Sequence, residues 1–90
     1  MARPKVEFQQ TPNPNAGKFV VDRQVTPVGT SRSYYDPEEA RGDAVARALM
    51  AVTGVRSLFM VDDFITVTKT PAARWDALVD PITAILQRHL

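Results

Sequence analysis

The sequence lacks cysteine altogether and contains a single histidine, His89. Disulfide bonds, thiolate nucleophiles, zinc ribbons and cysteine-ligated iron–sulfur clusters all require thiol groups, so the chain itself provides none of these. One imidazole does not make a histidine-rich metal site. At the end of a helix, a protonated His89 interacts favourably with the helix dipole instead. We therefore expect no metal site and no bound cofactor.

Excess charge of one sign and long apolar runs are also missing. Eleven Lys and Arg residues are balanced by ten Asp and Glu residues, so the formal net charge is +1. Charges of both signs are scattered without a run of like charge, so nothing builds the basic stripe of a dedicated nucleic-acid-binding protein. No apolar run approaches the roughly 20 residues that a membrane-spanning helix needs. The basic residues 1–5 lead into no apolar segment, so we expect no secretory signal and, by default, a cytoplasmic location.

Length and composition indicate one small folded domain over residues 1–90. Apolar residues make up 44% of the chain and charged residues 23%, which is ordinary for a globular protein. Ninety residues leave no room for two hydrophobic cores.

The N-terminal third is typical of short strands joined by loops. Residues 5–10 alternate between apolar and polar side chains, which predicts a strand. Residues 11–17 contain two prolines, two asparagines and a glycine, and these predict a rigid turn. Residues 18–21 resume an extended pattern that we expect to pair with the first strand. Residues 22–33 form a polar loop, and a short third strand is possible around residues 33–35.

A helix is predicted to begin at Asp36. Asp36 is a suitable N-cap, Pro37 suits the first helical position, and Glu39 completes a capping box. Gly54 is expected to follow the helix in a left-handed conformation. The apolar residues at helical spacing are Ala40, Ala44, Val45, Ala48, Leu49 and Val52.

Residues 55–61 and 64–69 are two strand-like runs on either side of Asp62-Asp63, which predicts a hairpin. In the second arm, alternation places two hydroxyl side chains opposite the apolar ones, as expected for a sheet covered on one face only.

The last helix is predicted to begin at Thr70-Pro71, a cap followed by proline. Pro81 interrupts it, and two outcomes are open: a kink in one helix, or a break with Asp80 capping a second helix. The unbroken apolar register favours the kink. This register consists of Trp75, Leu78, Val79, Ile82, Ile85, Leu86 and Leu90.

The predicted order is strand, strand, possible strand, helix, strand, strand, helix. Two amphipathic helices can cover one face of a mostly antiparallel sheet of four to five strands. The sequence therefore predicts an α+β two-layer sandwich with both helices on the same face.

Several of these segments together resemble the N-terminal domain of the Nfu/NifU-type scaffold family. The resemblance extends from about Glu7 to Leu90. Its residues are Thr11-Pro12-Asn13-Pro14-Asn15, Lys18-Phe19, Gly54-Val55, Leu58-Phe59, Asp63-Phe64-Ile65-Thr66-Val67-Thr68-Lys69, Trp75 and Pro81.

The resemblance implies a role in iron–sulfur cluster biogenesis. Family members with two domains carry a Cys-x-x-Cys pair in a second domain, and that pair assembles the cluster. This chain ends at Leu90 without cysteine, so we expect a stand-alone form, and no cluster-bearing residue carries over to it. The implied role is that of a protein-binding adaptor or regulator, with iron–sulfur assembly or client proteins as partners.

Nine polar residues are candidate contacts with such a partner, and they lie in the first loop, the second strand and the hairpin. Prolines pre-order the loop and lower the entropy that is lost on binding. Each group also has a purely structural explanation: turn chemistry, a solvated hairpin tip, or strand propensity. The nine are Thr11, Asn13, Asn15, Lys18, Asp62, Asp63, Thr66, Thr68 and Lys69.

The sequence favours two other classes of function less. A single-stranded nucleic-acid-binding module would stack bases on the exposed sheet face, with Tyr34 and Tyr35 near basic residues, but the near-zero net charge opposes this. For an enzyme, the sequence offers no nucleophile–base pair and no glycine-rich phosphate loop. Asp62 and Asp63 are adjacent in a strand-like segment and do not converge as catalytic carboxylates. We therefore expect no enzymatic activity.

Overall fold

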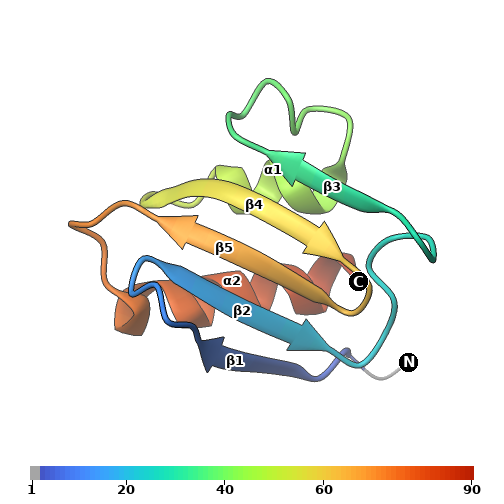
Figure 1. The fold of residues 1–90 in the computed structure, drawn as a ribbon, viewed down its shortest axis with the longest axis horizontal. Helices are drawn as coiled ribbons and strands as arrows, with labels where there is room; N and C mark the ends of the chain where they lie inside the picture. The colour runs from blue at the N-terminus through green and yellow to red at the C-terminus, as the bar shows by residue number, and fades with distance from the viewer. Residues whose placement is uncertain (1–2) are drawn as a thin grey trace.

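The computed structural model describes residues 3–90 (Figure 1). Met1 and Ala2, at the start of the stretch considered for a secretory signal, lie outside the described residues. Five strands and two helices follow one another along the chain. They are β1 (Val6–Gln10), β2 (Ala16–Val21), β3 (Ser31–Tyr34), α1 (Ala44–Met50), β4 (Val55–Val61), β5 (Phe64–Lys69) and α2 (Trp75–His89).

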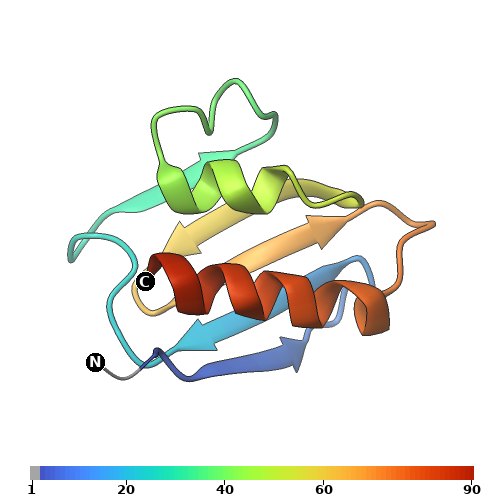
Figure 2. The same ribbon diagram turned by 180° about the vertical axis from the view of Figure 1, so that it is seen from behind.

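The strands form one antiparallel sheet in the order β1-β2-β5-β4-β3. Both helices lie on the same face of this sheet, and the opposite face has no helix over it (Figures 1 and 2). The predicted α+β two-layer sandwich is therefore confirmed. The possible third strand exists as β3, although it begins and ends earlier in the chain than the pattern indicated.

The hydrophobic core fills the space between the sheet and the helices. In β2 and β5 every second side chain is buried, because successive side chains of a strand point to opposite faces. The helix α2 contributes Leu78, Ile82 and Leu86, which lie four residues apart on one side of the helix. The largest fully buried side chains are Phe19, Leu49, Met60, Ile65, Val67, Ile82 and Leu86.

The predicted start of the first helix at Asp36 is wrong. Residues 37–42 form turns, and α1 begins at Ala44 with Asp43 as its N-cap. Asp36 does accept a hydrogen bond from the Glu39 N–H at 2.9 Å, but this caps only an isolated turn. Gly42 is a poor helix former, and the Asp43 carboxylate is held by contacts from β3.

The predicted start of the last helix at Thr70-Pro71 is also wrong. Residues 70–73 form a turn in which the Ala73 N–H donates to the Thr70 carbonyl at 3.1 Å, and α2 begins at Trp75. The helix then continues unbroken through Pro81, which excludes the alternative of a second helix capped by Asp80. Within residues 3–90 neither helix has the length and apolar character to cross a membrane.

The hairpin of β4 and β5 is confirmed. Asp62 adopts a left-handed backbone conformation with φ of 51° at the turn. Aspartate tolerates this conformation better than most residues, because its short polar side chain bonds locally. Gly54 has a φ of 99°, in the left-handed region as expected, four residues after the end of α1.

Candidate functional site

The nine candidate contact residues lie in three separate places. Thr11, Asn13 and Asn15 form the loop between β1 and β2, and Lys69 lies beside this loop. Asp62 and Asp63 form the hairpin tip at the opposite end of β5. The other three, Lys18, Thr66 and Thr68, point to the sheet face that no helix covers. The predicted set is therefore not one site.

We call this helix-free side of the sheet the uncovered face. Its side chains follow from the strand register: Lys18 pairs with Thr66, Thr66 with Phe59, and Phe59 with Ser33. These residues make a continuous row across four strands. The uncovered face consists of Glu7, Gln9, Ala16, Lys18, Val20, Ser31, Ser33, Ser57, Phe59, Val61, Phe64, Thr66 and Thr68.

Two phenylalanines give the uncovered face its apolar character. Phe59 is 41% exposed. Phe64 is half-buried, and the Lys18 ammonium lies 4.2 Å from the centroid of its ring, within cation–π range. Aromatic side chains amid small hydroxyl groups are a composition that protein interfaces favour.

Sequence reasoning missed both phenylalanines as surface residues. The signal was present in the alternation of β4, since Phe59 is out of phase with the buried Leu58 and Met60. In a run of consecutive apolar residues, however, periodicity alone does not identify the buried phase.

The loop of residues 11–15 is ordered by its own hydrogen bonds and by Trp75. The Asn15 N–H donates to Asn13 Oδ1 at 2.9 Å, and the Thr11 hydroxyl donates to the Ala16 carbonyl at 2.8 Å. The Trp75 indole N–H donates to the Pro14 carbonyl at 2.9 Å. The loop is thus a rigid connection, with a groove between it and Trp75.

Lys69 lies apart from Asp62 and Asp63, the other charged candidates of the hairpin. It lies at the other end of β5, is 7% exposed and points to the helix side of the sheet. Its ammonium donates to Asn15 Oδ1 at 3.1 Å and lies 5.9 Å from the centroid of the Trp75 ring. Lys69 therefore fastens the loop to the end of β5.

Replacing Lys69 by methionine tests this role. We expect Lys69→Met to lower the free energy of unfolding by about 1 kcal/mol, since the half-buried Asn15 Oδ1 loses a charged donor. Amide hydrogen exchange of Asn15 and Ala16 is expected to accelerate about tenfold. Lys18→Met, the same change on the uncovered face, serves as the control and should leave loop exchange unaltered. Equal acceleration in both variants would contradict the role of Lys69.

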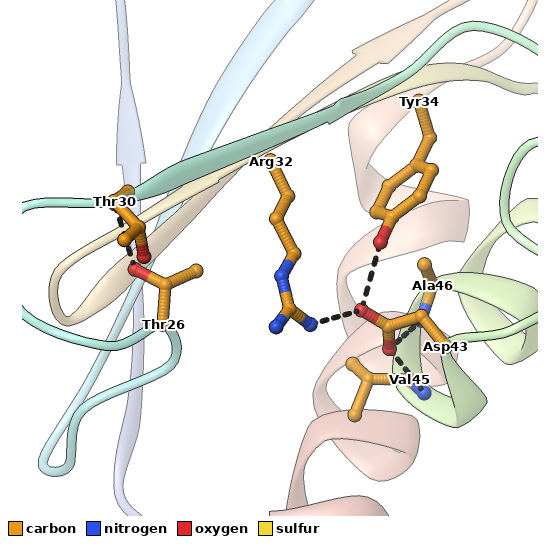
Figure 3. A network of polar contacts seen from close by, with 7 residues as sticks. All are labelled: Thr26, Thr30, Arg32, Tyr34, Asp43, Val45 and Ala46. Atoms are coloured by element: carbon orange, nitrogen blue, oxygen red, sulfur yellow. Dashed lines mark hydrogen bonds and ion pairs between the residues drawn. The ribbon is translucent and has the colours of Figure 1, made fainter.

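The hairpin tip is held through its backbone, and its carboxylates are exposed. The Asp62 N–H donates to the hydroxyl of buried Thr26 at 3.2 Å, and the Val21 N–H donates to the Asp63 carbonyl at 2.8 Å. The Thr26 hydroxyl also donates to the Thr30 carbonyl at 3.1 Å (Figure 3). Among residues 3–90, no three His, Cys, Asp or Glu side chains gather as a metal site would require.

A polar network links β3 to the start of α1 (Figure 3). Asp43 Oδ1 accepts from the N–H groups of Val45 and Ala46, both at 3.1 Å. Asp43 Oδ2 accepts from the Tyr34 hydroxyl at 3.1 Å and from Arg32 at 3.3 Å. Burial and the nearby Asp43 carboxylate raise the pKa of Tyr34 above its usual value.

This network also bears on base stacking. Tyr34 points to the helix side of the sheet, and Tyr35 lies beyond the end of β3. Neither tyrosine belongs to the uncovered face, so these two rings do not provide a stacking surface there.

Comparison with known proteins gives consistent matches over nearly the whole chain. The family model described as scaffold protein Nfu/NifU N terminal matches residues 6–90. The chain is 32% identical over 81 residues to the mitochondrial NFU1 iron-sulfur cluster scaffold homolog of Drosophila ananassae. It is 33% identical over 81 residues to the mitochondrial NifU-like protein 5 of Arabidopsis thaliana. Each match covers 90% of this chain but only 28% and 29% of those two relatives.

Two solved structures share the fold. The solution structure of a NifU-like protein from Saccharomyces cerevisiae has a TM-score of 0.82 at 25% identity, covering 96% of this chain and 77% of that chain. The crystal structure of protein SAV1430 from Staphylococcus aureus has a TM-score of 0.76 at 28% identity, covering 90% of this chain and 96% of that chain.

These relatives contradict the expected cytoplasmic location. The Drosophila and Arabidopsis proteins are mitochondrial. The expectation rested only on the absence of an apolar segment after residues 1–5, and this absence does not assign a compartment.

Proposed function

This chain belongs to the scaffold protein Nfu/NifU N-terminal family, and we propose that it works in iron–sulfur cluster biogenesis as a protein-binding module. The proposal treats residues 1–90 as one domain. The domain binds assembly or client proteins through its surface, without ligating a cluster through cysteine and without catalysing a reaction. The chain spans less than a third of its curated relatives, so the activity of those whole proteins is part of the proposal.

The uncovered face is the observation that carries the proposal. An antiparallel sheet with helices on one side leaves a broad surface on the other. Here that surface joins the exposed Phe59 and the half-buried Phe64 to three of the candidate residues, Lys18, Thr66 and Thr68. Because residues 1–90 contain no thiol, the proposal assigns to them contacts with other proteins and not the ligation of a cluster.

Crosslinking and capture from the source organism, with quantitative mass spectrometry, tests the proposal. We expect the wild-type chain to recover iron–sulfur assembly or client proteins. Thr66→Glu, which introduces a charge at the centre of the uncovered face, should reduce this recovery at least tenfold. Ala84→Glu at an exposed position of α2 is the matched control and should recover them as the wild type does. Circular dichroism and thermal unfolding verify that both variants fold.

Two results would overturn the proposal. One is the recovery of no iron–sulfur protein by the folded wild-type chain. The other is a stoichiometric cluster on the purified monomer after anaerobic reconstitution with iron and sulfide, because the chain would then carry a cluster despite having no cysteine.

A further inference from the structure

Strand β3 forms one edge of the sheet and pairs only with β4 among residues 3–90. An edge strand presents unpaired backbone N–H and C=O groups, and proteins usually protect such edges with proline, charge or a covering segment. The opposite edge, β1, is bounded by Pro4 and Pro12 and carries Glu7. β3 contains no proline, and its only charged side chain, Arg32, is bonded to Asp43 on the helix side, which leaves the other side of the strand without a charge.

The most exposed large apolar side chains of the described residues all surround this edge. Val28, 85% exposed, lies in the turn that leads into β3, and Tyr35, 71% exposed, directly follows the strand. Phe59, 41% exposed, is the partner of Ser33 in the neighbouring strand. Because Ser31 and Ser33 are small, β3 itself offers no side chain that would cover Phe59. Apolar surface and unpaired backbone therefore coincide at one place.

We propose that β3 binds an extended segment of another protein as a sixth strand of the sheet. Unpaired backbone groups specify an extended partner, as in recognition by strand addition. Apolar side chains at alternate positions of the segment would extend over the small Ser33 and contact the Phe59 ring. Pairing along β3, which has four residues, requires about four residues of the partner, or roughly 13 Å of extended chain. The segment 35–43 curves back beside the end of β3 on its way to α1, so the open part of the edge lies toward the start of the strand (Figure 1).

A second copy of this chain fits the edge less well. Two β3 strands pairing around a two-fold axis would each bring only Ser31 and Ser33 to the uncovered face. These serines are too small to cover Phe59 of the other copy. The partner is therefore a different chain with larger apolar residues at alternate positions. This inference deepens the proposed function and rests on it for the identity of the partner class.

Titration of the ¹⁵N-labelled chain with a synthetic peptide tests the inference. The peptide has ten residues, with alternating valine and threonine between terminal lysines. We expect amide shifts confined to residues 31–34 and their neighbours in β4, and at least tenfold slower hydrogen exchange along β3 at saturation. N-methylation of the peptide backbone at every second residue should weaken binding at least tenfold, because it removes the donors that pair with β3.

Variants separate edge pairing from other modes of binding. Phe59→Thr should weaken peptide binding about fivefold, whereas Ala84→Thr, at an exposed position of α2, should leave it unchanged. The inference is overturned by unshifted β3 amides at millimolar peptide, by shifts in β1 instead, or by equal binding of the N-methylated peptide. Its failure is distinct from that of the proposed function. If the peptide pairs with β3 but no iron–sulfur protein is recovered, the strand-addition inference stands and the proposed function is overturned. If iron–sulfur proteins are recovered but the peptide does not pair, the proposed function stands and the inference is overturned.

Discussion

Gly17→Ala is expected to lower the free energy of unfolding by about 2–3 kcal/mol, the largest effect of any single methyl group that we predict. A Cβ at Gly17 would lie 2.5 Å from Phe8 Cε1 and 2.9 Å from the Trp75 ring. Moving Phe8 disturbs two aromatic contacts, because its ring packs in tilted geometry against Phe19 and Trp75, with ring centroids 5.1 Å from each. Trp75 is further held by its hydrogen bond to Pro14.

Chemical denaturation followed by tryptophan fluorescence measures this effect directly, since Trp75 is the only tryptophan. Gly42→Ala is the matched control, because a Cβ at Gly42 meets nothing within 4 Å. We expect this control to change stability by less than about 0.5 kcal/mol. If both alanines had the same effect, the aromatic contacts would not be the reason for a glycine at residue 17.

Asp43→Ala is expected to cost about 2 kcal/mol of stability. Loss of an N-cap typically costs about 1 kcal/mol, and Asp43 caps both Val45 and Ala46. The substitution also leaves the half-buried Tyr34 hydroxyl without its acceptor and Arg32 without its ion pair. Because α1 has only seven residues, its own helix propensity offers little compensation.

Asp36→Ala is the informative comparison, since the sequence nominated Asp36 as the cap of the first helix. The structure confines Asp36 to an exposed turn, so we expect a loss of less than about 0.5 kcal/mol. Far-ultraviolet circular dichroism and urea unfolding distinguish the two variants. A larger loss in Asp36→Ala than in Asp43→Ala would place the start of α1 at the sequence-predicted position and contradict the observed cap.

The fold was largely predictable from local patterns. Alternation in residues 5–10 and 18–21, the turn at Asp62-Asp63 and the apolar register through Pro81 all appear in the structure as strands, hairpin and helix. The helix starts were not predictable. Asp36-Pro37 and Thr70-Pro71 have the chemistry of a cap, but such motifs also stabilise single turns. Contacts from β3 to Asp43 decided where α1 begins.

The candidate site was predictable only in part. Thr66 and Thr68 were assigned correctly to a face opposite Ile65 and Val67, because a strand fixes this relation locally. Lys69 continues the buried phase of the same strand, yet its charge led us to expect exposure. Its acceptor, Asn15, lies 54 residues earlier in the chain, and no local pattern reveals such a partner.

The sequence by itself determined that residues 1–90 contain no thiol and that an amphipathic sheet and two amphipathic helices must share one core. These properties depend on composition and on periodicity within single segments. Tertiary structure alone decided that β3 is an edge of the sheet and that Phe59 is exposed beside it. Each of these depends on contacts between segments far apart in the chain, and the surface that a partner meets is defined by those contacts.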